Sequence, residues 1–171
     1  IEGNQGEKTI GLRADMDALP IEEKTGALYA SLIPGKMHAC GHDVHTTILL
    51  GASYILQQLK EEFKGNVKLF FQPAEETVGG AKPMIDEGVL NNPKVDAAFG
   101  AHLLGSLKEG QIRTMHGHMM ASPDTFSFKV IGRGGHGAEP QNSIDPIIIT
   151  CQIVSSLQTI ISRRLSPLTP A

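Results

Sequence analysis

The sequence predicts an α/β fold in which buried strands alternate with helices along the first two thirds of the chain. Short apolar runs at residues 67–71 and 95–103 are typical of buried strands. The segment between residues 43 and 63 instead repeats its apolar residues every three or four positions, which is typical of an amphipathic helix. Alternation at this spacing predicts a mixed, helix-covered sheet.

The first expected strand lies in KTIGLRAD, residues 8–15, and leads into a polar loop that carries Asp15 and Asp17. The expected helix begins near Asp43 and continues to about Phe63, where a glycine and an asparagine follow and favour its end. This order brings the polar loop to the end of a strand, just before a helix.

The strand at 67–71 is expected to end before Pro73, because proline lacks the N–H that a sheet ladder needs. A short helix is expected around 80–88, followed by the strand in VDAAFGAHL, residues 95–103. Ligand sites of such sheets gather where strands end. The polar residues at or just past these ends are Asp15, Glu75, Glu76 and His102.

Pro123 and Asp124, which precede a segment of alternating apolar and polar residues, predict a domain boundary near residue 120. The two expected domains are residues 1–120 and residues 121–171. In the second, residues 125–132 alternate like a strand with one solvated face. Asp145 followed by proline predicts a helix start, with an apolar face at Ile149, Ile153, Leu157 and Ile160. One strand and one helix cannot bury both of their faces, so this unit reads as the start of a smaller α+β domain.

The composition argues against two classes of partner. The net charge is −3 and no stretch is strongly basic, which argues against a nucleic-acid surface. No apolar run reaches the roughly 18 residues that span a bilayer, so no membrane partner is expected. The two cysteines, Cys40 and Cys151, lie in unrelated settings, one among histidines and one on an apolar helical pattern. We therefore expect free thiols and a reducing, cytoplasmic location.

The segment MHACGHDVHT concentrates soft metal donors just before the expected helix. Cys40 and His42 are two residues apart, so in an extended loop both side chains point the same way and can reach one ion. Sulfur and imidazole together suit zinc and other borderline divalent metals. A loop packed by hydrogen bonds explains the pair equally well. A structural zinc site would need further Cys or His pairs, and none is present.

Other candidate residues also have two interpretations. Of the adjacent Glu75 and Glu76, one could bind a metal while the other acts as a general base, although surface Glu pairs are common. His102 ends an apolar strand, where many histidines are structural. Asp15 and Asp17 either orient a ligand histidine or cap turns. His136, in GRGGHGAEP, either donates to a developing oxyanion or sits in an exposed turn.

Taken together, five motifs of this chain closely resemble the M20 metallopeptidase family. In order along the chain, they are LRADMDALP, HACGHDVHT, QPAEE, GAH and GGHGAEP. The amidohydrolase branch of this family, which includes N-acyl-amino-acid amidohydrolases, hippurate hydrolases and auxin-conjugate hydrolases, is the most similar. The resemblance implies a catalytic domain that binds two divalent metal ions, zinc or manganese before cobalt or nickel. It also implies a smaller lid domain through which the protein forms a homodimer.

By position, the resemblance implies specific roles in hydrolysis of the amide bond of N-acyl amino acids or small peptide-like substrates. Glu75 matches the general base that activates water, and His136 matches a lid histidine supplied to the partner subunit. Asp15 matches an acid beside the metals. The residues that match metal ligands are Cys40, His42, Glu76 and His102.

The family's final metal-binding histidine has no match after residue 136, so the resemblance also implies that the chain is an internal fragment. Two other hypotheses stay open. Cys40 would be a nucleophile with His42 or His45 as its base, or the chain would be a binding or oligomerisation module without catalysis.

Overall fold

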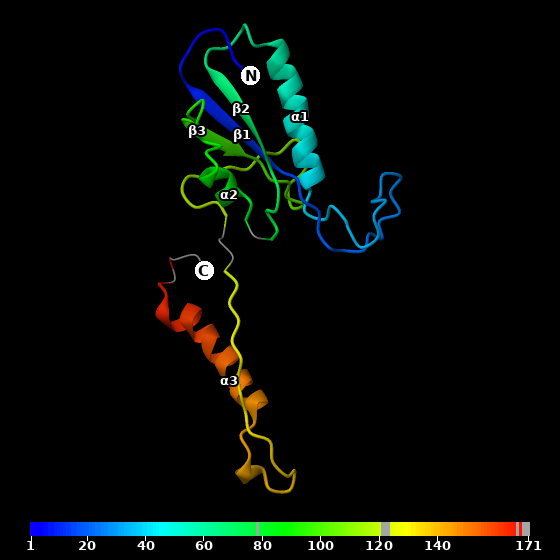
Figure 1. Cartoon of the computed structure of the whole chain (residues 1–171), viewed down its shortest axis with the longest axis vertical. Coiled ribbons are helices and arrows are strands. Elements are labelled where there is room, and N and C mark those ends of the chain that lie inside the picture. The colour runs from blue at the N-terminus through cyan, green and yellow to red at the C-terminus, as the bar shows by residue number, and fades with distance from the viewer. Residues whose placement is uncertain (78, 121–123, 167, 169–171) are drawn as a thin grey trace. The chain divides into compact units, whose positions relative to one another are not determined.

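The computed structural model describes residues 1–77, 79–120, 124–166 and 168 (Figure 1). The chain divides into two compact units, residues 1–109 and residues 110–171. The expected boundary between residues 120 and 121 falls at the segment 121–123, outside the described residues.

The first unit is built on a parallel sheet of three strands in the order β2-β1-β3. Strand β1 (Thr9–Asp15) is central and pairs with β2 (Asn66–Gln72) and β3 (Ala97–Gly100). The register sets Asp15 opposite Gln72, so β1 and β2 end at the same level. An isolated antiparallel bridge joins Glu2 to Asn66. The predicted α/β class is confirmed.

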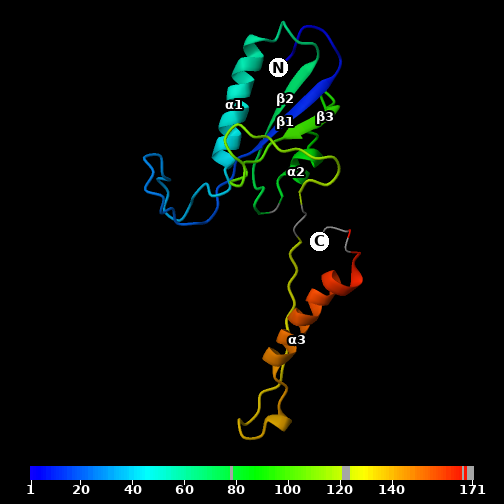
Figure 2. The same cartoon turned by 180° about the vertical axis from the view of Figure 1, so that it is seen from behind.

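Helix α1 (His42–Gln58) packs on β1 and β2 (Figures 1 and 2). It buries Leu49 against the sheet, where Ala14 and Phe70 complete the apolar core of the described residues. The helix ends at Gln58, before the expected Phe63, and the segment that follows is held by a bond from the N-terminal segment. The backbone N–H of Asn4 donates to the carbonyls of Lys60 and Phe63, at 3.0 and 2.8 Å.

Two further elements of this unit are shorter than expected. Helix α2 is Ala81–Asp86 rather than 80–88. Strand β3 covers four residues of the expected 95–103, because the chain leaves the sheet after Gly100. The N–H of Leu103 then donates to the ring of His45 at 2.9 Å instead of joining a ladder.

The second unit contains helix α3 (Pro146–Thr159), a 3-10 turn (Pro140–Asn142) and a π-helical turn (Ile160–Arg164). Asp145 caps α3 as predicted, with its carboxylate accepting from the N–H of Ile147 at 2.8 Å. The strand expected at 125–132 does not form, because no described segment of this unit lies beside it as a ladder partner. None of the helices in the described parts of the chain is long and apolar enough to cross a membrane.

Candidate metal centre

The carboxyl ends of the parallel strands converge on the N-terminus of α1 (Figure 1). Asp15 is the last residue of β1, and the chain after β3 brings His102 to the same end of the sheet. Cys40 and His42 lie on either side of Gly41, where α1 begins. Segments far apart in sequence thus supply the donors, as is usual for sites at the strand ends of α/β sheets.

Two glycines shape the loops that hold these donors. Gly41 adopts a left-handed conformation with φ of 83°, which turns the chain between Cys40 and the first residue of α1. At Gly80, any side chain would overlap the carbonyl oxygen of Pro73. This close approach folds the segment that carries Glu75 and Glu76 back on itself, with the Ala74 carbonyl accepting from Gly79 and Gly80 at 3.0 and 3.1 Å.

Two sets of potential metal donors share His42. In each set, the ligand atoms lie within 4.8 Å of one another: Cys40, His42 and His102 form one, and His42, Glu75 and Glu76 form the other. The Cys40 Sγ lies 3.5 Å from the His102 Nε2. The His42 Nε2 lies 3.8 Å from a Glu76 oxygen and 3.9 Å from a Glu75 oxygen. The structure therefore brings together all four predicted ligands and the predicted base.

The ring of His42 is fixed by a carboxylate on the side away from these donors. Its Nδ1 lies 3.2 Å from Oδ1 of Asp17, whose other oxygen accepts from the backbone N–H of Glu76 at 2.9 Å. Burial raises the pKa of Asp17, but the N–H groups of Glu76, Glu75 and Asp17 outweigh it and hold this pKa below its usual value. Asp17 is thus a carboxylate that orients His42 through Nδ1–H.

The other ring nitrogen of His42, Nε2, shows whether the site suits a metal ion. The side chain is 0% exposed, and its Nε2 has no hydrogen-bond partner among the described residues. Buried polar atoms are normally satisfied, so an orphaned imidazole nitrogen needs an explanation. A divalent cation supplies one, because sulfur, imidazole and carboxylate donors surround this nitrogen and suit borderline divalent metals. The residues present fit such an ion.

Asp15, which the resemblance placed beside the metals, is 1% exposed and lies 3.5 Å from the His42 Nε2. Its oxygens accept from the His45 Nδ1 at 2.6 Å and from the Arg13 guanidinium at 2.8 Å. Burial raises the pKa of Asp15, but the His45 hydrogen bond and the charge of Arg13 outweigh burial and lower the pKa overall. Asp15 therefore stays ionised beside His42.

A third donor set, Asp15, His42 and His45, is less suited to a metal. Both nitrogens of His45 already have protein partners, Asp15 on one side and the N–H of Leu103 on the other. A histidine engaged in this way offers no lone pair to an ion.

Cys40 is half-buried and has no disulfide, and Cys151 is an exposed free thiol rather than a packed one. A hydrogen bond to Glu76, burial and the charges of Glu76, Glu75 and Asp15 raise the pKa of Cys40 to about 11. A nucleophilic cysteine needs the opposite shift. A cation beside the sulfur would reverse this effect, because it favours the thiolate.

His136 belongs to the second unit and is exposed. Its Nδ1 accepts from the N–H of Ala138 at 3.2 Å. The proton of the neutral ring therefore lies on Nε2, which makes that nitrogen a donor available to a ligand. His38, His116 and His118 are also exposed.

Arg13 and Gln72 belong to the site but were not predicted. Arg13 donates from Nε to the Gln72 side chain and from Nη1 to Asp15, both at 2.8 Å. Arg13 and Asp15 are two residues apart on one strand and so share a face, and that spacing is a signal in the sequence. Gln72 gives no such signal, since its place opposite Asp15 depends on the strand register.

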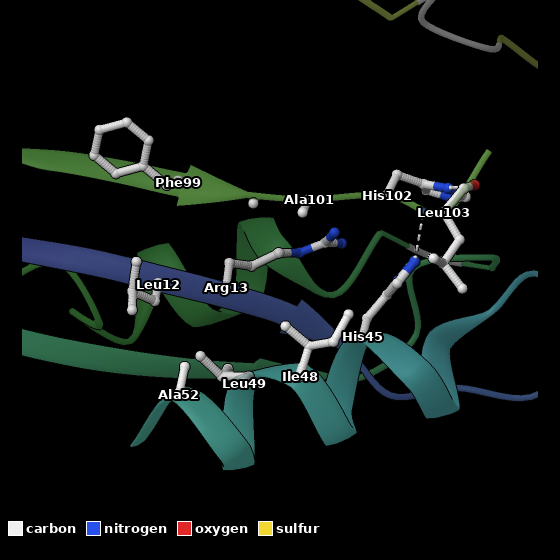
Figure 3. A pocket seen from close by; sticks show the side chains of 11 residues that line it. Leu12, Arg13, His45, Ile48, Leu49, Ala52, Phe99, Ala101, His102 and Leu103 are labelled. Carbon is white, nitrogen blue, oxygen red and sulfur yellow. Dashed lines mark hydrogen bonds between the residues drawn. The ribbon is translucent and has the colours of Figure 1, made fainter. Parts of the chain in front are cut away.

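A cavity of about 320 Å³ lies behind the donors, between α1 and strands β1 and β3 (Figure 3). Its wall is mostly apolar, with Leu12, Ile48 and Leu49 among the lining residues. His45 and His102 close one end of this cavity.

Comparisons with known proteins agree with this geometry. The model of peptidase family M20/M25/M40 matches residues 11–163. The chain is 48% identical over 172 aligned positions to thermostable carboxypeptidase 2 of Saccharolobus solfataricus, covering 99% of this chain and 43% of that protein. It is 47% identical over 169 positions to an N-acyl-L-amino acid amidohydrolase of Geobacillus stearothermophilus, covering 98% of this chain and 45% of that protein.

A solved structure is similar as well. A dinuclear metal-binding peptidase of the M20 family from Bacillus subtilis superposes with a TM-score of 0.60 at 47% identity, covering 63% of this chain and 30% of that chain. The chain spans less than half the length of the curated relatives named above. Because the family model covers most of the chain, including the donor residues, the chain belongs to peptidase family M20/M25/M40.

Proposed function

We propose that the protein hydrolyses the amide bond of N-acyl amino acids or small peptide-like substrates with the help of two divalent metal ions. The observation that carries this proposal is the buried, unpartnered Nε2 of His42, which faces a thiol and carboxylates. Relatives named as an N-acyl-L-amino acid amidohydrolase and a dinuclear metal-binding peptidase support it.

In this proposal four residues hold the metals: Cys40, His42, Glu76 and His102. The single free nitrogen of His42, Nε2, can bind only one of the two ions, and the two donor sets that share it lie side by side. Zinc and manganese are the expected metals, and cobalt or nickel also fits this donor chemistry. A thiolate ligand disfavours the hard ions magnesium and calcium.

Glu75 is the proposed general base. Its side chain is 42% exposed, against 24% for its neighbour Glu76, so it is the more accessible of the two to a water molecule at the site. It takes a proton from the attacking water and returns that proton to the leaving amine. Bound divalent ions would polarise the scissile carbonyl and acidify water.

We further propose that His136 acts across a homodimer formed through the second unit. Its Nε2–H is available, and such a group stabilises the negative charge that develops on a carbonyl oxygen. The substrate carbonyl would thus be contacted by a residue of the partner subunit.

Two alternatives have less support. A Cys40 nucleophile conflicts with the raised pKa of its thiol and with the engagement of His45 by Asp15 and Leu103. A non-catalytic binding module leaves the orphaned His42 nitrogen without an explanation. A cytoplasmic location stays a proposal that rests on the free thiols of Cys40 and Cys151, and cell fractionation would test it.

The test is metal analysis and an activity panel on the longest natural form of the protein that contains these residues. N-acetyl and N-benzoyl amino acids are assayed before and after chelation, and after addition of zinc or manganese. We expect about two metal ions per subunit, loss of hydrolysis with chelator and recovery with metal. Activity that survives complete metal removal would contradict the proposal.

A further inference from the structure

His45 connects two parts of the site through opposite sides of one ring. It lies in the first turns of α1, is 5% exposed, and reaches both the end of β1 and the chain after β3. Its Nδ1 is 2.6 Å from an oxygen of Asp15, and its Nε2 is 2.9 Å from the backbone nitrogen of Leu103. Figure 3 shows this second bond between α1 and the segment after β3.

The hydrogen bonds determine which nitrogen of His45 carries the proton. A backbone N–H can only donate, so the Nε2 that receives the Leu103 N–H has a free lone pair. The proton of the neutral ring is therefore on Nδ1 and is donated to Asp15. One tautomer satisfies both partners.

The same logic continues to His102. Its Nδ1 lies 2.6 Å from the carbonyl oxygen of Leu103, and a carbonyl can only accept, so Nδ1 carries the proton. The lone pair of His102 is left on Nε2, which is the atom 3.5 Å from the Cys40 sulfur. Leu103 is therefore held by His45 at its N–H and holds His102 at its C=O.

The packing around the two histidine rings makes these hydrogen bonds hard to replace. The His45 and His102 rings pack edge to face with centroids 4.7 Å apart. Both rings line the apolar cavity, which is a poor source of replacement hydrogen bonds. Loss of the His45 ring would leave the Leu103 N–H and an Asp15 oxygen without these partners, and would free the segment that carries His102.

We propose that His45 is a positioning residue of the metal centre. Its ring orients the Asp15 carboxylate, which lies beside His42, and it orients His102 through Leu103. The proposal rests on the proposed function for its metal ions, but it concerns metal affinity rather than the substrate. His45 itself is proposed to contact neither substrate nor metal, which distinguishes it from the four proposed ligands.

Three substitutions separate the two hydrogen bonds. His45→Gln extends an amide to about the place of Nε2, where its oxygen can accept from Leu103. His45→Asn ends at about the place of Nδ1, where its N–H can donate to Asp15 but nothing reaches Leu103. His45→Leu removes both bonds at similar size. His116→Leu, in the second unit and exposed, is the matched control.

The experiment titrates cobalt(II) into the metal-free protein, with thiolate and ligand-field absorption as the readout alongside calorimetry. Substitutions of groups that orient ligands typically weaken metal affinity about 10–100-fold. We expect a loss of this size for His45→Leu and His45→Asn, with altered ligand-field absorption. We expect a smaller loss for His45→Gln, because the bond to Leu103 is retained, and no change for His116→Leu.

The outcomes are distinct. Wild-type affinity and absorption in His45→Asn would overturn the proposal, whereas equal losses in His45→Gln and His45→Asn would support it, because each variant keeps only one of the two bonds. If His45→Leu does not fold, the Gln and Asn variants still decide. Tight metal binding without hydrolysis of any substrate would contradict the proposed function alone, whereas a wild-type protein that binds no cobalt would overturn both.

Discussion

Asp17 orients His42: its Oδ1 lies 3.2 Å from the His42 Nδ1, and its Oδ2 accepts from the Glu76 N–H at 2.9 Å. One carboxylate thus fixes a proposed ligand on α1 and the backbone of another after β2. The unpartnered Nε2 of His42 consequently faces the donors.

Asp17→Asn should weaken divalent metal binding. An asparagine side chain offers one acceptor oxygen where Asp17 offers two, so either His42 or the Glu76 N–H loses its partner. We expect an affinity loss of about 10–100-fold, measured by calorimetric titration with zinc. Asp43→Asn, an exposed change of the same kind next to His42, is the control and should bind as wild type. Unchanged affinity in Asp17→Asn would contradict this role.

Glu75→Gln and Glu76→Gln should fail in different ways, although the residues are neighbours. Glu75→Gln keeps its metal content, but its kcat falls by at least about 100-fold, because the amide cannot take a proton from water. Glu76→Gln should instead bind metal more weakly, because a neutral amide is a weaker ligand than a carboxylate. Metal analysis and steady-state kinetics on both variants check this. Near-normal turnover in Glu75→Gln would rule out its role as the base.

Iodoacetamide should modify Cys151 before Cys40 in the metal-free protein. With its pKa raised to about 11, the Cys40 thiol is protonated at neutral pH and little of it is the reactive thiolate. Its labelling rate should rise as the pH approaches 11. Mass spectrometry of labelled peptides at several pH values measures both sites, with Cys151→Ala as the control. Fast labelling of Cys40 at pH 7, with loss of activity in the metal-loaded protein, would favour the nucleophile hypothesis.

A mixture of Glu75→Gln and His136→Ala subunits should recover hydrolysis that neither variant shows alone. In a mixed dimer, one site combines an intact Glu75 with an intact His136 of the partner subunit. The measurement is activity after co-expression or after dissociation and reassociation. If His136 acts within its own subunit, or if no dimer forms, the mixture stays as inactive as its components.

Acid should destabilise the first unit partly through Asp96. A hydrogen bond from Lys8 and another from the Thr9 N–H hold the pKa of Asp96 below its usual 3.8. A lowered folded-state pKa stabilises the fold above the unfolded value, and this contribution is lost as the pH falls through the folded value. Urea midpoints of Asp96→Asn should therefore fall less than those of wild type below about pH 4.

Glu7→Gln is the matched control, because it removes another exposed acid, just before β1. Its urea midpoints should follow wild type across the acid range. Equal acid sensitivity of Asp96→Asn and wild type would show that the Lys8–Asp96 pair contributes nothing measurable, as many exposed ion pairs do.

Local patterns predicted much of the architecture. Apolar periodicity predicted α1, β2 and the α/β class, and the Asp145–Pro146 pair predicted the start of α3, because these signals depend on a few neighbouring residues. The strand expected at 125–132 was wrong, since alternation specifies which side chains share a face but supplies no partner strand. The end of α1 was also missed, because apolar spacing that extends to Phe63 does not by itself fix where a helix ends, and the helix stops at Gln58.

The sequence by itself determined which residues to propose as ligands and base and their order along the chain, since the family resemblance points to Cys40, His42, Glu75, Glu76 and His102. Only the tertiary structure decided which acid serves which histidine: Asp17 holds His42, and Asp15 holds His45. The two acids are two residues apart and chemically alike. Their assignment depends on how α1 packs on β1 and where the chain after β3 returns, and both are set by contacts between segments far apart in the chain.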